Sequence, residues 1–178
     1  MNICDSILSL SPYQGGKPIS ELQRELGLDA VVKLASNENP LPVSNKVRTA
    51  IEQAMQEIGR YPDGNGFELK QAISKHLSLS AEQITLGNGS NDLLELLARI
   101  SVCQASDEVI FSQYAFVVYP LATKALGAKA VVTPAKNFGH DLEAMRLAIT
   151  DKTKLIFIAN PNNPTGTLLE EQAIYDFL

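Results

Sequence analysis

The sequence predicts an α/β fold with a mostly parallel sheet and helices on both faces. From residue 84 onward, short apolar runs alternate with helical patterns. The apolar runs lack the alternating polar residues of a strand that has one face in water, which is typical of buried parallel strands. The chain has 178 residues, of which 45% are hydrophobic and 20% charged, so it is long and apolar enough to form a sizeable core.

The first 80 residues contain helices separated by dense turns. "SPYQGGKP" (11–18) and "SNENPLP" (36–42) are turn sequences, and between them we predict a helix over 19–26 that Gly27 ends. Residues 31–34 (VVKL) are predicted to form a strand. Ser44 is expected to cap a helix that runs to Gly59, and a further helix is expected over 67–77.

The remaining sequence alternates between the two kinds of element. Strands are predicted at 84–86, 108–111, 129–133 and 154–159, and helices at 90–101, 119–126, 141–149 and from 168 onward.

The composition excludes several classes of function. A net charge of −5 and a pI near 5.0 give no reason to expect nucleic acid or an anionic membrane as partner. Cys4 and Cys103 form no metal-binding pattern, so we expect no metal and free thiols in a reducing compartment. His76 and His140 lack partners at metal-ligand spacing, and we expect His76 in a helix and His140 in a turn, both in surface or structural roles. The sequence has no signal-peptide pattern and no membrane-length apolar run, and we expect a cytoplasmic protein.

Three predicted loops follow strands of the sheet, and ligands of such sheets bind outside the carboxyl ends of the strands. They are "GNGSN" (87–91), "SQYAF" (112–116) and "NPNNPTG" (160–166). We therefore expect all three on one rim.

"LGNGSND" is a glycine-rich turn that leads directly into a helix. Glycines let the backbone approach a ligand, and the free N–H groups of a first helical turn favour an anion. Gly89, Ser90 and Asn91 are candidates for binding a phosphate, with the Ser90 hydroxyl as a further donor; the alternative is a plain N-cap at Ser90.

The other two loops also have a functional and a structural interpretation. In "SQYAFVVY", Phe116 or Tyr114 is expected to stack on a planar ring, or else the aromatics pack the top of the core. In "NPNNPTG", each Asn–Pro pair disfavours helix and fixes a bend, with a cis bond possible at one of them. Such rigidity favours the presentation of an amide side chain to a ligand over a plain strand-to-helix loop in which Thr167 lies near the next N-cap.

"NPNNPTG" resembles the signature of the fold type I aminotransferases, which use pyridoxal 5'-phosphate. "LSPYQGGKPISEL", "KLASNENPLP", "YPDGNGFELK" and "GNGSNDLLELL" together resemble histidinol-phosphate aminotransferases, in order and spacing, from about Leu10 to the last residue. The resemblance implies a three-layer large domain, truncated and preceded by an N-terminal arm. Residues 1–40 would be the arm and the start of the small domain, and 41–178 the N-terminal part of the cofactor-binding large domain.

The resemblance also assigns cofactor contacts. It implies that Gly89, Ser90 and Asn91 bind the cofactor phosphate and that Asn163 donates a hydrogen bond to the phenolic oxygen of the cofactor. It aligns the stacking ring best with Phe116, with Tyr114 as the alternative.

Three more residues acquire roles in a homodimer. By resemblance, Tyr61 reaches the cofactor phosphate of the neighbouring subunit, Tyr13 approaches the partner's substrate, and Asn37 binds substrate. The implied reaction transfers the amino group of glutamate, which becomes 2-oxoglutarate, to imidazole acetol phosphate. The product is histidinol phosphate, in histidine biosynthesis.

In that family, the Schiff-base lysine, the aspartate at the pyridine nitrogen and the arginine for the substrate carboxylate all follow "NPNNPTG". No catalytic residue is therefore assigned in this chain, because Lys75, after Ser74, is predicted to be a surface residue of a helix. We expect a fragment of a working enzyme or a non-catalytic phosphate-binding remnant, poorly stable alone and without transaminase activity. The alternatives are an aromatic aminotransferase, a phosphate-handling decarboxylase of the same fold, or a complete small nucleotide- or phosphate-binding module.

Overall fold

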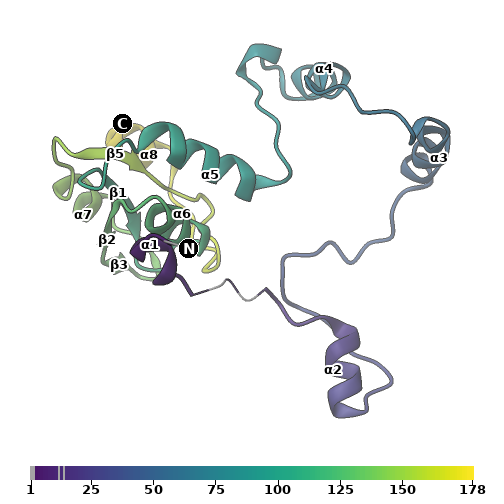
Figure 1. Ribbon diagram of the computed structural model, residues 1–178, viewed down its shortest axis with the longest axis horizontal. Coiled ribbons are helices and arrows are strands. Elements are labelled where there is room, and N and C mark those ends of the chain that lie inside the picture. Colours follow the sequence, from purple (N-terminus) through teal and green to yellow (C-terminus); the bar gives the residue numbers. More distant parts are fainter. Residues whose placement is uncertain (1–2, 12, 14) are drawn as a thin grey trace. The chain divides into compact units, whose positions relative to one another are not determined.

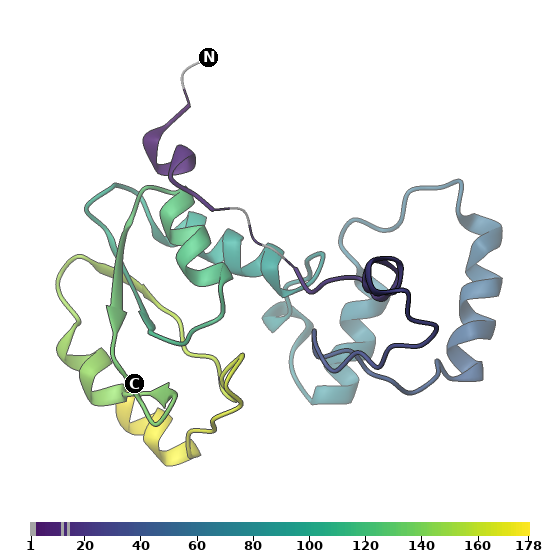
Figure 2. The same cartoon turned by 90° about the horizontal axis from the view of Figure 1, so that it is seen from below.

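The structure is a computed structural model that describes residues 3–11, 13 and 15–178. The chain divides into two compact units, drawn in Figure 1 and, from below, in Figure 2. We call Met1–Tyr13 with Leu86–Leu178 the sheet unit, and Gln14–Thr85 the helical unit. The predicted boundary at residue 40 concerns the domains of longer relatives and stays a prediction.

The sheet unit contains a three-stranded sheet whose strands are all parallel. Strand β1 (Glu108–Ser112) lies in the middle, between β2 (Lys129–Thr133) and β5 (Thr153–Ile156). Residues pair in step from Glu108 with Lys129 to Ser112 with Thr133, so β1 and β2 end level with each other. The predicted parallel sheet is therefore confirmed.

Two pairs of helices cover the sheet. Helix α5 (Ser90–Ser101) packs against α6 (Val118–Ala125), and α7 (Leu142–Leu147) packs against α8 (Glu171–Phe177). Figure 2 shows the two pairs on opposite sides of the strands. This confirms the predicted three-layer α/β architecture. A short N-terminal helix, α1 (Asp5–Leu8), packs on α6.

The core lies between the sheet and the pair α5 and α6. Val109 and Phe111 of β1 are buried together with Tyr119 of α6, and the Tyr119 ring stacks on Phe157 with centroids 4.3 Å apart and planes 2° from parallel. Burial raises the pKa of the Tyr119 hydroxyl. On the side of α7, Met145 is fully buried.

A buried carboxylate joins the strands at their amino ends. The Glu108 side chain accepts hydrogen bonds from Lys129 Nζ at 2.8 Å and from Thr150 Oγ1 at 2.6 Å. These two donors, Lys129 first, hold the pKa of Glu108 below its ordinary value. One side chain thus connects β1, β2 and the turn before β5.

The helical unit confirms the helices that the sequence predicts there. Helix α2 (Ile19–Leu26) ends at Gly27, which has a φ of 63°. Ser44 Oγ accepts the Val47 amide at 3.3 Å and so caps the next helix. The remaining elements of this unit are α3 (Asn45–Ala54), η1 (Met55–Glu57), α4 (Phe67–Leu77) and η2 (Ala81–Gln83).

The two predicted strands at 31–34 and 84–86 do not form. A strand is stabilised by the ladder it makes with a neighbour, and the described residues supply no neighbour to either segment. Val32 and Leu34 are accordingly 84% and 94% exposed. The apolar composition of these segments favoured a buried strand, and the structure shows neither the strand nor the burial.

A hairpin in the sheet unit was missed. Strands β3 (Ala135–Lys136) and β4 (Gly139–His140) pair antiparallel around a two-residue turn. His140, which we expected in a turn, is on β4 and only 6% exposed. The ends of two other elements also shifted: β5 stops at Ile156, earlier than predicted, and α8 begins at Glu171, later than predicted.

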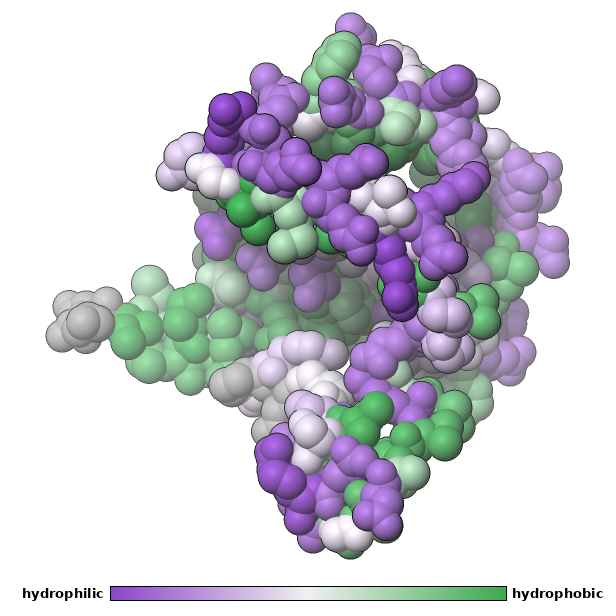
Figure 3. Space-filling model, turned by 90° about the vertical axis from the view of Figure 1, so that its right-hand side faces the viewer, coloured by the Kyte–Doolittle hydropathy of each residue, from purple (hydrophilic) through white to green (hydrophobic). Residues whose placement is uncertain are grey.

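Apolar side chains are also exposed. In Figure 3, green apolar residues lie open among purple hydrophilic ones.

Cys4 and Cys103 are exposed free thiols, as expected. None of the described helices is long and apolar enough to cross a membrane.

Candidate active site

Two of the three predicted rim loops meet at the carboxyl ends of the strands. Strands β1 and β5 are parallel neighbours, so the segments that follow them leave from the same edge of the sheet. Asn162 Nδ2, in the loop after β5, donates to the main-chain oxygen of Tyr114, in the loop after β1, at 3.0 Å. A hydrogen bond thus joins the loops after β1 and β5, two of the three loops that the sequence placed on one rim.

The three asparagines of "NPNNPTG" have different roles. Asn160 uses its whole side-chain amide within the loop: Oδ1 accepts the Leu169 amide at 2.8 Å, and Nδ2 donates to the Leu169 oxygen at 3.1 Å. Asn162 is 3% exposed and also donates to Thr165 Oγ1 at 2.7 Å. Asn163 is half-buried, and its side chain has no hydrogen bond to any described residue. Only Asn163 therefore has its amide free for a ligand.

The main chain of the loop closes on itself. The Asn162 amide donates to the Thr167 oxygen at 2.8 Å, and the Gly166 amide donates to the Asn162 oxygen at 2.7 Å. The bonds Asn160–Pro161 and Asn163–Pro164 are both cis, where the sequence suggested one. The loop that carries Asn163 is accordingly tied at both of its ends.

The two candidate stacking rings differ in their freedom. Phe116 is partly buried, packs against the core cluster and meets the edge of Tyr119 at 6.0 Å and 87°. Tyr114 is 40% exposed and lies against Phe138, with ring centroids 5.5 Å apart. Phe116 is thus held against the core, and Tyr114 is the more exposed of the two rings.

The glycine-rich turn has the backbone that an anion site needs. Gly89 has φ 84° and ψ 173°, a combination that essentially only glycine adopts. Its own amide donates to the Gly87 oxygen at 2.9 Å, whereas the amides of Ser90 and Asn91 have no acceptor among the described residues. The free donors are therefore those of Ser90 and Asn91, and Gly89 contributes its conformation.

The position of this turn follows from the chain path. Helix α5 ends at Ser101, and β1 begins at Glu108 after a short connection, so the helix returns toward the amino edge of the sheet. Its N-terminus consequently faces the side on which the strands end. No hydrogen bond between described residues joins this turn to the other two loops.

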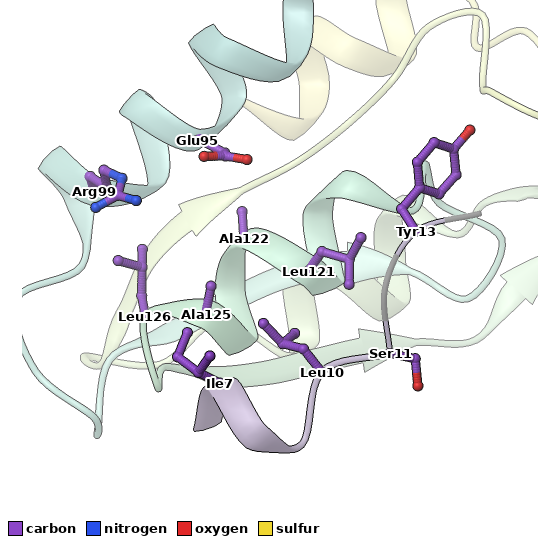
Figure 4. A pocket seen from close by; sticks show the side chains of 10 residues that line it. All are labelled: Ile7, Leu10, Ser11, Tyr13, Glu95, Arg99, Leu121, Ala122, Ala125 and Leu126. Atoms are coloured by element: carbon purple, nitrogen blue, oxygen red, sulfur yellow. The ribbon is translucent and has the colours of Figure 1, made fainter. Parts of the chain in front are cut away.

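The N-terminal arm lines a groove of about 450 Å³ with α5 and α6. Leu10 of the arm lies opposite Leu121 and Ala125 of α6, and Tyr13 also lines the groove (Figure 4). Tyr13 lies at one end of the groove, with its ring directed away from the apolar floor. Lys124 Nζ donates to the Ser9 oxygen and fixes the arm on α6.

Two further predicted residues belong to the helical unit. Tyr61 is fully exposed beside a turn in which Asp63 accepts the amides of Asn65 and Phe67 at 2.9 and 2.8 Å. Asn37 is exposed and has a φ of 52°. Among the predicted site residues, the structure thus brings together the two loops that carry Tyr114, Phe116 and Asn163.

Sequence reasoning missed the residues that support the rim. Asn160, Asn162 and Asn163 are asparagines of one short motif. Only the fold shows which of their side-chain amides makes no hydrogen bond within the described residues. The structural role expected for His140 is borne out, but its burial could not be predicted, because it depends on the loop at 159–167, which is distant in sequence. A positive φ at Asn137 is a weak signal for the hairpin, since asparagine tolerates that conformation.

Comparison with known proteins identifies the family. The family described as "Aminotransferase class I and II" matches residues 29–178. The histidinol-phosphate aminotransferase 1 of Idiomarina loihiensis is 62% identical over 172 residues, and that of Mannheimia succiniciproducens is 60% identical over 172 residues. Both alignments cover 97% of this chain and 47% of the relative, so the chain spans about half the length of these curated relatives.

Solved structures share the fold. The histidinol-phosphate aminotransferase of Sinorhizobium meliloti, solved in complex with pyridoxal-5'-phosphate, superposes with a TM-score of 0.86 at 28% identity, over 98% of this chain and 46% of that one. A mutant aspartate aminotransferase of Thermus thermophilus has a TM-score of 0.76 at 23% identity, over 99% of this chain and 50% of that one. The chain is therefore a fold type I aminotransferase domain, truncated relative to its relatives, and it belongs to the class I and II aminotransferases.

Proposed function

We propose that this chain is part of a pyridoxal-phosphate-dependent aminotransferase that transfers the amino group of glutamate to imidazole acetol phosphate. The observation that carries the proposal is the free amide of Asn163, held in a loop whose other two asparagines are used internally. The relatives at 62% and 60% identity are histidinol-phosphate aminotransferases, which supports this substrate pair over that of other transaminases.

The residues of the glycine-rich turn and of the Asn163 loop fit different parts of the cofactor. The unbonded amides of Ser90 and Asn91 suit its phosphate, because the first turn of a helix favours an anion. The space beside Gly89 is open, since apart from its own neighbours in the chain no atom lies within 4 Å of the position where its Cβ would be. Asn163 would donate its amide hydrogen to the phenolic oxygen of the cofactor. Pyridoxal phosphate, when bound, supplies an electron sink for the α-carbon of the amino acid.

For the stacking ring, we propose Tyr114 ahead of Phe116. Tyr114 is exposed at the rim, and its main chain is bonded to the loop of Asn163, whereas Phe116 packs with the core. A Tyr114→Ala substitution should then weaken cofactor binding more than Phe116→Leu, which keeps the core filled.

The remaining roles rest on the resemblance. We propose that Tyr61 and Tyr13 act in the partner subunit of a homodimer, on the cofactor phosphate and the substrate respectively, and that Asn37 binds substrate. The full exposure of Tyr61 beside the turn built by Asp63 supports a role outside its own unit. The Schiff-base lysine would come from sequence outside residues 1–178. The exposed free thiols support a reducing, cytoplasmic location.

The test is an amino-transfer assay on the full-length polypeptide that contains residues 1–178. With glutamate and imidazole acetol phosphate, we expect turnover that Asn163→Ala lowers strongly and Asn45→Ala, an exposed asparagine of α3, leaves unchanged. Residues 1–178 alone should give none. A preference for aromatic amino acids, carbon dioxide release, or turnover by residues 1–178 alone would contradict the proposal.

A further inference from the structure

The hairpin of β3 and β4 has a strained tip. Ala135 pairs with His140 and Lys136 with Gly139, so the turn consists of Asn137 and Phe138, with φ values of 51° and 62°. Two-residue hairpin turns of type I′ have positive φ at both central residues and usually place glycine second. A phenylalanine there costs energy, and such a residue persists where its surroundings hold it.

The Phe138 side chain has a partner at the rim. Its ring lies against Tyr114, with centroids 5.5 Å apart and planes tilted by 36°. Glycine would relieve the strain of the turn but remove this contact. The tip of the hairpin thus touches the loop after β1.

The next residue touches the loop after β5. A Cβ on Gly139 would lie 3.0 Å from Thr167 Oγ1 and 3.3 Å from Thr167 Cβ. A side chain at position 139 would therefore press against Thr167, the residue that follows the Asn163 loop.

His140 continues the contact. Its ring is buried, and Nε2 lies 2.9 Å from the main-chain oxygen of Ala159, the residue before the first Asn–Pro pair. A carbonyl oxygen only accepts, so Nε2 carries the proton and donates. Nδ1 is buried without a hydrogen-bond partner among the described residues. The histidine thus makes one directed bond, to the start of the Asn163 loop.

We propose that Phe138, Gly139 and His140 are positioning residues that hold Tyr114 and the Asn163 loop in register. Three consecutive residues of one hairpin contact both rim loops, and Asn162 joins those loops to each other. The proposal rests on the proposed function, in which those loops bind the cofactor ring, but its structural part is measurable without cofactor.

The experiment is residue-resolved amide hydrogen exchange on the full-length polypeptide that contains residues 1–178. The reporters are the Asn162 and Gly166 amides, which are bonded within the loop, and the reference is the Phe157 amide, bonded to Ile110 in the sheet. Loss of one hydrogen bond from His140→Phe should speed exchange at Asn162 and Gly166 about five- to tenfold and leave Phe157 unchanged.

Controls separate positioning from general stability. His140→Gln, which keeps a donor, should restore exchange to within about twofold of the wild type, and His76→Phe, at the exposed histidine of α4, should have no effect. If His140→Phe does not fold, Gly139→Ala serves as the second probe, and its Cβ should produce the same local effect by pressing on Thr167.

Unchanged exchange at Asn162 and Gly166, an equal rise at Phe157, or failure of glutamine to rescue would overturn the proposal. Addition of pyridoxal phosphate to the wild type distinguishes the two ideas. If the cofactor protects no rim amide while His140→Phe still loosens the loop, the proposed function fails and the positioning role stands. If the cofactor protects the rim amides but His140→Phe leaves exchange in the loop unchanged, only the positioning role is rejected.

Discussion

The two units of this chain differ in where their apolar residues lie. The sheet unit contains every buried residue of the described chain, including Val109, Ile110 and Met145, which are fully buried. No residue from 15 to 85 is buried, although α3 carries exposed Val47 and Ile51, and exposed Met55 follows directly after it in η1. Local signals such as caps are thus enough to form helices, but they do not give those helices a core.

The same difference affects the site. The rim residues are supported by contacts within one folded unit, such as the bond from Asn162 to Tyr114. Tyr61 and Asn37 lie in the unit without a core, and their roles rest on resemblance.

The largest effect is expected in the core, where a matched pair of methionines is available. Met145→Ala in the sheet unit should cost about 2–5 kcal/mol of unfolding free energy, because it leaves a cavity. Met55→Ala, at an exposed position next to α3, should cost less than about 0.5 kcal/mol. Urea unfolding of the polypeptide gives both values.

A cost below about 1 kcal/mol for Met145→Ala would contradict the buried core. A cost of about 2 kcal/mol or more for Met55→Ala would mean that another copy, or another part of the longer protein, covers this face of α3.

Two carboxylates allow a comparison through pH. Asp107 accepts the Cys103 amide at 2.8 Å and the Gln104 amide at 3.1 Å, and Asp63 makes the equivalent pair of bonds to Phe67 and Asn65. These backbone donors lower the pKa of both groups below the ordinary 3.8. Each carboxylate therefore stabilises the fold at pH values above 3.8, and this contribution is lost as pH falls through the lowered pKa.

Asp107→Asn should lower the urea midpoint at pH 7, and the difference from the wild type should shrink as the pH falls below 3.8 toward the lowered pKa of Asp107. Asp63→Asn should show the same sign with a smaller size, because Asp107 is 2% exposed whereas Asp63 is open to solvent, where charge interactions are screened. A larger effect at Asp63, or a difference that grows as the pH falls, would argue against this interpretation.

The smallest effect concerns the cap of α3. Ser44→Ala should remove about 1 kcal/mol of helix stability, because the Val47 amide loses its acceptor. Thr49→Ala, in the same exposed helix, should act in the opposite direction through its higher helix propensity. Circular dichroism of a peptide of residues 42–59 measures both, and a change of the same sign for both would show that the cap does not set this helix.

The elements that could be predicted are those with local signals. Gly27 ends α2, Ser44 caps α3, and the alternation after residue 100 gives β1 and β2 at nearly the predicted bounds. These signals work because capping and periodicity act within a few residues.

What could not be predicted depends on distant neighbours. The segments 31–34 and 84–86 have strand composition, yet no neighbouring strand pairs with them in the part of the chain that is described. The location of the rim could be predicted, because the carboxyl ends of the strands of a parallel sheet lie at one edge. The choice of Asn163 as the free amide, and of His140 as its support, required the actual hydrogen bonds.

The central claim is that Asn163 and the first turn of α5 bind one cofactor. The most direct measurement is an NMR titration of the labelled full-length polypeptide with pyridoxal phosphate. We predict that the Asn163 side-chain amide and the main-chain amides of Ser90 and Asn91 shift together, with a common midpoint. Saturating cofactor that leaves the Asn163 side-chain signals unmoved, or that moves them at a different midpoint from Ser90 and Asn91, would contradict the account.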